Sequence, residues 1–246
     1  LTTTYNHLQP LTTTYNHLQP LLRTMTTSTQ HTRFISISGN IGCGKSSLLK
    51  RLQNNFDVCV EPEPVHEWGE WLQMFYLNPK QYAMGLQLKI LMSFKDLFNK
   101  HRELNTSQPV LVERSPIEGL RVFANALVDA DTGEPVFTSM ELDLLQQLVS
   151  YIGWVPHTYI YLRTTPSVCV ARIQSRNIHV EQNISHDYIN KLHDKYELLF
   201  SPFLARTETL GSKQVFVVDA DDTQDAVFQK VSALLQKSGL INCERI

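Results

Sequence analysis

The sequence predicts an α/β fold in which a five-stranded parallel sheet lies between two layers of helices. Short apolar runs alternate with longer amphipathic segments along the chain, which is the order of strands and helices in such a sheet. The first apolar run, residues 34–37, leads directly into a glycine-rich segment and then a helical one. With 246 residues, of which 42% are apolar, the chain suits one domain with a full core.

Residues 39–46, GNIGCGKS, match the phosphate-binding pattern G-x-x-x-x-G-K-[ST] at every position. Glycines let the backbone N–H groups turn toward an anion, and the following helix adds the positive end of its dipole. In such a loop Lys45 reaches the β- and γ-phosphates of a nucleoside triphosphate, and the Ser46 hydroxyl ligates Mg²⁺. The alternative is a glycine-rich turn without a ligand. The predicted triphosphate-binding residues here are Gly39, Asn40, Ile41, Gly42, Cys43, Gly44, Lys45, Ser46 and Ser47.

The remaining elements follow from hydrophobic periodicity and from proline and turn signals. Further strands are expected over residues 57–60, 109–115, 157–162 and 215–218. Helices are expected over residues 45–54, 68–77, 79–101, 117–129, 139–152, from 167 onward, 186–204 and 223–236. Proline follows both Glu61 and Glu63, and we expect it to keep this segment extended and free of helix until residue 68.

Charged residues gather where the predicted second and third strands end. Glu63 lies just past the second strand, and Glu113 with Arg114 ends the third. Ligands of parallel sheets bind at the carboxyl ends of the strands, so we expect these residues beside the phosphate loop. Arg172 and Arg176 are four apart on a helix and can face the same way as a cationic lid. The alternatives are a surface ion pair at the strand end and a solvated helix face.

Composition restricts the partners. A formal charge of −2 creates no field that attracts a polyanion, so we expect no nucleic-acid partner. We find no N-K-x-D segment of the kind that reads guanine in GTPases, and no apolar run approaches the ~20 residues of a membrane span. The four cysteines, Cys43, Cys59, Cys169 and Cys243, are far apart, and a disulfide at Cys43 would distort the phosphate loop. We therefore expect a reducing compartment, the cytoplasm.

The first 32 residues form a separate region. The decapeptide LTTTYNHLQP occurs twice in succession over residues 1–20, which is too short for a solenoid and indicates a disordered leader. The leader has no acidic residue and carries Arg23, as mitochondrial transit peptides do, so a mitochondrial location is the alternative. The folded domain is expected over residues 33–240.

From residue 34 to about residue 223 the chain resembles the deoxynucleoside kinase family. The matching segments are GNIGCGKS, EPVHEW, the helix with Gln87, ERS, YLRT-P, the arginine-rich segment and the DAD loop, in the family's order. The resemblance implies a three-layer P-loop kinase fold, ATP and Mg²⁺ as cofactors, and a homodimer. It also implies transfer of a phosphoryl group to the 5′-hydroxyl of a deoxynucleoside in nucleotide salvage.

The resemblance assigns roles at the reacting end of the substrate. Glu63 matches the base that accepts the 5′-hydroxyl proton, and Arg114 matches an arginine near the 5′-oxygen. Glu113 would orient the Mg²⁺ shell together with Ser46. Arg172 and Arg176 match lid arginines over the phosphates. The adenine of ATP would rest against a loop formed by Asp219, Ala220 and Asp221.

The resemblance also assigns a nucleoside pocket. Gln87 matches the residue that pairs with the base edge, Trp68 lies beside the base, and Phe123 stacks on it. Tyr76 and Glu181 match the pair that holds the 3′-hydroxyl. Each of these residues has a purely structural alternative. Trp68 and Phe123 could be core aromatics, Gln87 a residue at the boundary of the core, and Tyr76 a residue on the helix surface. The predicted pocket comprises Glu63, Trp68, Tyr76, Gln87, Ile90, Phe94, Arg114, Gly119, Phe123 and Glu181.

Four positions depart from the family pattern. Relatives that prefer deoxycytidine or purines carry an aspartate and an arginine where this chain has Gly119 and Phe94. We therefore predict that thymidine, deoxycytidine or both are preferred over purine nucleosides. Ile178 replaces a lid arginine, and Pro116 directly after ERS is expected to shift the start of the next helix.

Two other functions share this fold. A nucleoside monophosphate kinase would need a further cationic pocket for the acceptor phosphate, and no such cluster is visible in the sequence. A catalytically silent kinase-like subunit would not need intact Lys45, Ser46, Glu63 and Arg114. The sequence therefore favours an active deoxynucleoside kinase.

Overall fold

The computed structural model describes residues 32–104, 108–129, 131–152, 155–176, 184–204, 209–210 and 213–241. Within these residues six strands form one sheet in the order β2-β3-β1-β4-β6-β5. Five of them are parallel, as predicted: β1 (Phe34–Ser38), β2 (Cys59–Glu61), β3 (Val110–Glu113), β4 (Thr158–Arg163) and β6 (Lys213–Asp219). The sixth, β5 (Thr209–Leu210), adds an antiparallel pair at the edge beside β6.

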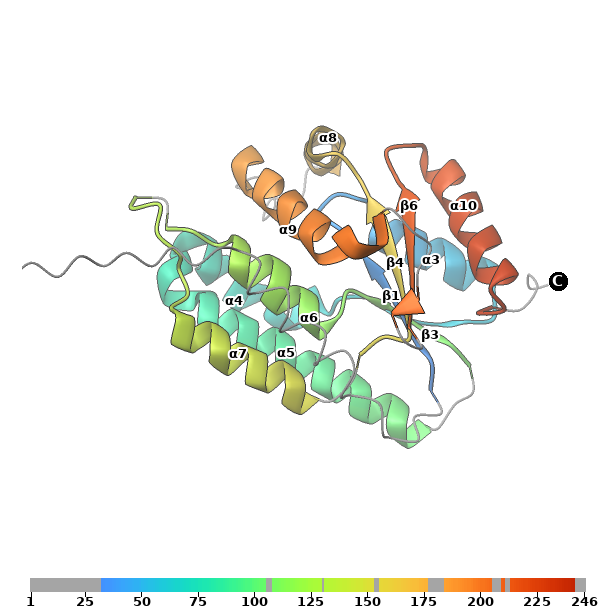
Figure 1. Ribbon diagram of the computed structural model, residues 1–246, viewed down its shortest axis with the longest axis horizontal. Helices are drawn as coiled ribbons and strands as arrows, with labels where there is room; N and C mark the ends of the chain where they lie inside the picture. The colour runs from blue at the N-terminus through green and yellow to red at the C-terminus, as the bar shows by residue number, and fades with distance from the viewer. Residues whose placement is uncertain are drawn as a thin grey trace, which may run out of the picture.

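The helices lie close to their predicted ranges. Their bounds are α3 (Lys45–Asn55), α4 (Val65–Leu77), α5 (Pro79–Leu104), α6 (Pro116–Glu118) with the π-helical turn η1 (Gly119–Ala124), α7 (Ser139–Ile152), α8 (Pro166–Arg176), α9 (His186–Leu204) and α10 (Gln224–Lys237). Figure 1 shows α3 and α10 on one side of the sheet, and α9 with the group α4, α5, α6 and α7 on the other. The molecule therefore has three layers.

Side chains of β1 alternate between the two faces of the sheet, so this strand contributes to the core on both sides. Ile35 and Ile37 pack with α3 and α10, whereas Phe34 packs with α5 and α7 on the opposite side. All three side chains are buried. Successive residues of a strand point to opposite faces, so a continuous apolar run is what a strand covered on both faces requires.

Two boundaries differ from the prediction around the second strand. The strand lies at Cys59–Glu61 because Cys59 and Glu61 pair with Val110 and Val112 of β3. Helix α4 begins at Val65, directly after Pro64. Proline restricts the residue before it and not the one after it, so the chain becomes helical three residues earlier than expected.

The helix after β3 also differs from the expected range 117–129. It begins at Pro116, with Ser115 in the N-cap position, because a proline at the first helical position costs no intrahelical hydrogen bond. It then widens into the π-helical turn η1, in which the Asn125 side chain donates to the Leu120 carbonyl at 2.6 Å. The helical segment ends at residue 126 and Val128 pairs with Pro135, so the predicted helix was too long.

Capping explains why α7 and α10 begin where they do. Thr138 and Glu141 form a capping box, with Glu141 N–H donating to the Thr138 hydroxyl at 3.2 Å and Thr138 N–H donating to the Glu141 carboxylate at 2.8 Å. The Thr223 hydroxyl accepts from the Ala226 N–H at 3.2 Å at the start of α10. The predicted leader, residues 1–32, lies outside the described residues except for Thr32.

Within the described ranges, no helix has both the length and the apolar character that a membrane crossing needs.

Candidate active site

A cavity of about 520 Å³ lies at the carboxyl ends of β1 and β3, where the sheet order reverses direction around β1. Its walls come from the phosphate loop, the β2–α4 connection, α4, α5, the β3–α6 junction and α9. The predicted site residues that line it are Ile41, Gly42, Gly44, Lys45, Ser46, Ser47, Glu63, Trp68, Tyr76, Gln87, Ile90, Phe94, Glu113, Arg114, Gly119, Phe123 and Arg176.

The other predicted residues lie elsewhere. Glu181 is outside the described residues. Gly39, Asn40 and Cys43 belong to the phosphate loop but do not line the cavity. Three further residues that do not line it lie at the end of β6, namely Asp219, Ala220 and Asp221, and a fourth, Arg172, lies on α8.

The phosphate loop has the backbone that its glycines predict. Gly44 has φ 101°, a left-handed conformation, and α3 begins at the next residue. A Cβ on Gly39 would lie 2.7 Å from the Cys43 Sγ and 2.8 Å from the Leu162 carbonyl oxygen. The loop is anchored to α9 because the Asn40 side chain donates to the Ile189 carbonyl at 2.9 Å. The loop is therefore a preformed anion cradle.

Lys45, Ser46 and Glu113 form a polar group at the base of the cavity. The Lys45 Nζ donates to the Asn40 carbonyl at 2.9 Å and lies 3.8 Å from a Glu113 carboxylate oxygen. The Ser46 hydroxyl donates to Glu113 at 3.0 Å. A hydroxyl and a carboxylate side by side at a phosphate loop are the oxygen donors that Mg²⁺ takes in triphosphate sites, so these residues fit the metal.

Glu63 and Arg114 face each other across the same cavity. Arg114 Nη1 donates to Glu63 Oε2 in an ion pair, with side-chain exposures of 9% and 15%. Burial raises the pKa of Glu63, although the Arg114 charge opposes this rise. Burial alone would lower the pKa of Arg114, but the carboxylates around it, Glu63 foremost, hold that pKa well above its usual value. Glu63 is therefore an accessible carboxylate whose proton affinity exceeds that of an ordinary glutamate.

The neighbouring glutamate points elsewhere. Glu61 Oε1 accepts from Lys100 at 2.6 Å and lies 2.7 Å from the His101 Nε2, and Glu61 does not line the cavity. Of the two glutamates that precede prolines, Glu63 is the one that reaches the cavity.

The far half of the cavity is an apolar slot with few polar groups. Gln87 and Phe94 from α5 are both about one-twentieth exposed, at 5% each. The Trp68 indole N–H is buried and finds no acceptor among the described residues. The Arg114 guanidinium lies 4.8 Å from the centre of the Phe123 ring. A flat, partly polar molecule fits such a slot, with Gln87 available to pair with its edge.

Gly119 leaves room for Gln87. A Cβ at Gly119 would lie 3.0 Å from the Gln87 Oε1, which is tighter than most Cβ contacts. The carboxamide of Gln87 therefore extends into space that a side chain at position 119 would restrict.

The two arginines predicted as a lid separate in the structure. Arg176 lines the cavity. Arg172 donates instead to the backbone carbonyls of Ala220 at 2.9 Å, Asp222 at 2.8 Å and Cys43 at 3.4 Å. It thereby joins the phosphate loop to the loop after β6. Four-residue spacing on a helix predicts a shared face, but the two side chains serve different neighbours.

Sequence reasoning missed three residues at this site. Tyr188 of α9 lines the cavity, and burial raises its pKa. Tyr196 donates to Glu118 at 2.9 Å and accepts from the Arg114 Nε at 3.4 Å. Tyr188 and Tyr196 reach the site only because α9 packs across the sheet, and no local pattern marks them. Glu118 carried a signal, since it is a carboxylate three residues after Ser115 in a mostly apolar helical segment.

Comparison with known proteins identifies the family of this chain. The family model described as deoxynucleoside kinase matches residues 35–237. Protein 029R of Invertebrate iridescent virus 3 is 31% identical over 82% of this chain and 96% of its own length. Deoxycytidine kinase 2 of Gallus gallus is 30% identical over 81% of this chain and 85% of its own length.

Solved structures also share the fold of this chain. Deoxyadenosine kinase from M. mycoides aligns with a TM-score of 0.70 and 19% identity, covering 83% of this chain and 99% of that chain. The family match spans the phosphate loop, the Glu63–Arg114 pair and the arginine-bearing α8. This chain belongs to the deoxynucleoside kinase family.

Proposed function

We propose that this kinase transfers the γ-phosphoryl group of ATP to the 5′-hydroxyl of a deoxynucleoside, with Glu63 as the general base. The observation that carries the proposal is the Glu63–Arg114 pair, which lines the same cavity as Lys45 and Ser46. A 5′-hydroxyl placed beside Glu63 gives its proton to the carboxylate as its oxygen attacks the γ-phosphorus. The bond from that phosphorus to the bridging oxygen of ADP breaks.

Each charged residue has a task in this step. Lys45 binds the β- and γ-phosphates, and Arg114 neutralises charge that gathers on the transferred group. Ser46 and Glu113 would hold Mg²⁺, which when bound shields the phosphate charge. A raised pKa makes Glu63 a better proton acceptor than an ordinary glutamate.

We also propose that pyrimidine nucleosides are preferred, thymidine first and deoxycytidine next. Phe94 lines the slot with a bulky apolar ring, and Gly119 provides no charged partner for an amino group or a purine edge. Gln87 can pair with the donor and acceptor of a pyrimidine edge. Deoxycytidine kinases and a thymidine kinase both occur among the relatives. The proposed preference therefore rests on the pocket residues and not on the names of the relatives.

Two measurements test the proposal. Glu63→Gln is expected to lower kcat by ~10²–10⁴-fold with a modest effect on nucleoside binding, because the amide cannot accept the proton. Glu61→Gln is the matched control, since that residue pairs with Lys100 and is expected to retain kcat. A phosphate-transfer assay over a panel of deoxynucleosides gives the base preference. Near-normal turnover of the Glu63 variant refutes the base assignment, and a higher kcat/KM for deoxyguanosine than for thymidine refutes the pyrimidine preference.

We further propose that the chain forms a homodimer through α5 and α7. Met140, Leu144 and Tyr151 recur along one stripe of α7 and are 81%, 47% and 79% exposed. Met92 of α5 is 61% exposed and lies one turn before Lys95, whose Nζ is 5.4 Å from the centre of the Tyr151 ring. A contiguous apolar face of this kind suits a second copy of the same chain.

For location we propose the cytoplasm. The free thiols of Cys43, Cys59 and Cys169 support a reducing compartment, and Cys43 belongs to the phosphate loop.

A further inference from the structure

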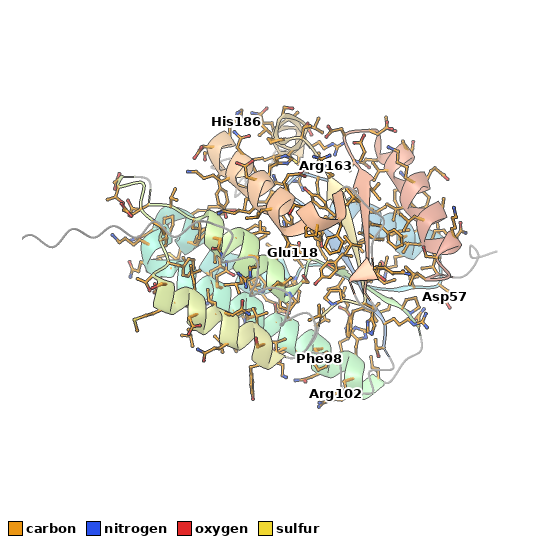
Figure 2. All side chains as sticks on the ribbon, in the orientation of Figure 1. Asp57, Phe98, Arg102, Glu118, Arg163 and His186 are labelled. Carbon is orange, nitrogen blue, oxygen red and sulfur yellow. The ribbon has the colours of Figure 1, made fainter. Side chains whose placement is uncertain are left out.

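We infer that Glu118, which lies outside the cavity, is a positioning residue that holds the Arg114 guanidinium in its catalytic orientation through the Tyr196 hydroxyl. The inference rests on the proposed function, because it takes from it the role of Arg114. Figure 2 shows Glu118 in the interior of the molecule, between the sheet and the helices of the α4–α7 side. Its exposed fraction is 0%, and it does not line the cavity.

The carboxylate of Glu118 is bound at both oxygens by hydroxyl groups. Oε2 accepts from Tyr196 at 2.9 Å. Oε1 accepts from Ser38 at 2.8 Å and from Ser115 at 2.9 Å, with Ser36 at 3.4 Å. Three elements therefore supply donors, namely β1, the β3–α6 junction and α9. A buried glutamate surrounded by hydroxyl donors is arranged to accept hydrogen bonds, which is the property of the ionised form.

The Tyr196 hydroxyl transmits this arrangement to the active site. Its proton goes to Glu118, so its oxygen lone pairs are free to accept from the Arg114 Nε at 3.4 Å. A hydroxyl that donates to a carboxylate becomes a stronger acceptor, because successive hydrogen bonds polarise one another. The other end of the guanidinium donates to Glu63, and its face lies over Phe123. Tyr196 and Glu118 thus fix the end of Arg114 that does not face the substrate.

Arg114 needs such support because its backbone is unfavourable. Its φ is 64°, and among the described residues it is the one non-glycine residue with a positive φ. A left-handed backbone conformation at a residue with a long side chain persists only where surrounding contacts hold it. Its N–H donates to the Ile37 carbonyl at 3.1 Å, and its side chain is held by Glu63 and Tyr196.

The surroundings of Glu118 shift the pKa of its carboxyl group. Burial raises the pKa of Glu118, whereas Arg114 and the hydroxyl donors oppose that rise. The other titratable groups facing it are Tyr196 and Tyr159, and burial holds the pKa of both well above neutral pH. Glu118 is therefore the member of this cluster that gains a proton as pH falls, while the tyrosines stay protonated and Arg114 stays charged.

The test compares Glu118→Gln with the native enzyme across pH. Glutamine keeps the size of the side chain and lacks the charge. At pH 8 we expect kcat to fall about tenfold, the lower range for a supporting partner of a catalytic group. KM for ATP and for thymidine should change less than about twofold, because the lost contact acts on the transition state.

The decisive readout is the ratio of native to variant kcat as pH is lowered. The ratio should shrink toward one, because the native Glu118 becomes protonated and then resembles glutamine. Loss of Glu63 ionisation lowers kcat in both enzymes, and the acid limb of kcat/KM in each enzyme shows where it sets in. A ratio that stays constant with pH identifies a packing role and overturns the inference.

A second variant covers the case in which Glu118→Gln does not fold. Tyr196→Phe removes the connecting hydroxyl and should give the same loss of kcat with unchanged KM. When both variants fold, the double variant should be no worse than Tyr196→Phe alone. The matched control is Tyr161→Phe, a buried tyrosine whose hydroxyl donates to Glu197 at 2.8 Å and does not contact Arg114. Equal losses of kcat in the two tyrosine variants overturn the inference.

Arg114→Ala separates this inference from the function on which it rests. Loss of activity in Arg114→Ala together with full activity in Glu118→Gln or Tyr196→Phe refutes the inference and leaves the proposed function intact. Full activity in Arg114→Ala refutes the proposed role of Arg114 itself.

Discussion

At the scale of single residues, the charged side chains of the site are largely shielded from water. Glu63, Glu113 and Arg114 stand together with Lys45 at the closed end of a cavity, and three of these four have exposures below one-tenth. Interactions between charges are strongest where water is excluded. Proton affinity and phosphate binding at this site therefore depend on neighbours more than on residue type.

The pH dependence of activity follows from the raised pKa of Glu63. The base works as the carboxylate, so activity is complete above its pKa and falls as pH drops through it. Because burial raises that pKa, the acid limb of kcat/KM should lie at higher pH than the titration of a free glutamate at about 4.3. Rate measurements with thymidine between pH 4.5 and 8 check this, and a limb at or below the free value would contradict it.

Lys45 is expected to act on the phosphate donor whatever the nucleoside. Lys45→Ala removes the buried ammonium that lies 3.8 Å from Glu113 and faces the phosphate loop. We expect kcat/KM for ATP to fall by roughly 10²-fold or more, by the same factor with thymidine and with deoxycytidine. Steady-state kinetics with both nucleosides measures this. A loss that differs strongly between them would place Lys45 in nucleoside recognition instead.

At the scale of elements, the site depends on loops that other elements hold in place. Asn40 ties the phosphate loop to α9, and Arg172 of α8 ties it to the loop after β6. The Asp221 carboxylate accepts from the Thr165 N–H at 2.7 Å, which joins that loop to the start of α8. Loops fixed in this way keep a binding surface formed before the ligand arrives.

Arg172→Ala should therefore weaken ATP binding more than nucleoside binding. The substitution removes donors to Cys43, Ala220 and Asp222 and leaves the loop after β6 less ordered. We expect KM for ATP to rise by about tenfold while KM for thymidine changes little. The control is Arg163→Ala, which loses only its surface pair with Glu197. Equal effects of the two substitutions would contradict the bridging role.

At the scale of the whole molecule, one face of the helical layer has an apolar surface that a single chain leaves open. It runs over α5 and α7, which lie side by side on the side of the sheet away from α3 and α10 (Figure 1). Residues of this helical layer and of the phosphate loop together line the cavity. An interface at α5 would therefore support, from behind, the helix that contributes Gln87 and Phe94.

Leu144→Glu should convert the proposed dimer to a monomer. A charge in the centre of the α7 stripe is costly to bury against a second apolar face. Light scattering after size-exclusion chromatography gives the mass directly, and the variant should show half that of the native protein. Leu198→Glu is the control, because Leu198 is 56% exposed on α9, away from that stripe. A native protein that is already monomeric contradicts the dimer.

The sequence by itself determined the strand–helix order, the phosphate loop and the placement of Glu63, Glu113 and Arg114 at strand ends. These features are local, since a strand needs only its own apolar run and a phosphate loop only its own glycines. The register of β2, the start of α4 and the π-helical turn depended on partners elsewhere in the chain. Local pattern therefore placed those boundaries wrongly by a few residues.

Only the tertiary structure decided which side chains meet. It separated Glu61 from Glu63, turned Arg172 away from Arg176, and brought Glu118 and Tyr196, 78 residues apart, within 2.9 Å of each other beneath Arg114. The physical reason is that a buried charge must find its partners across the fold, wherever packing brings them. Residue spacing along the chain carries no record of those contacts.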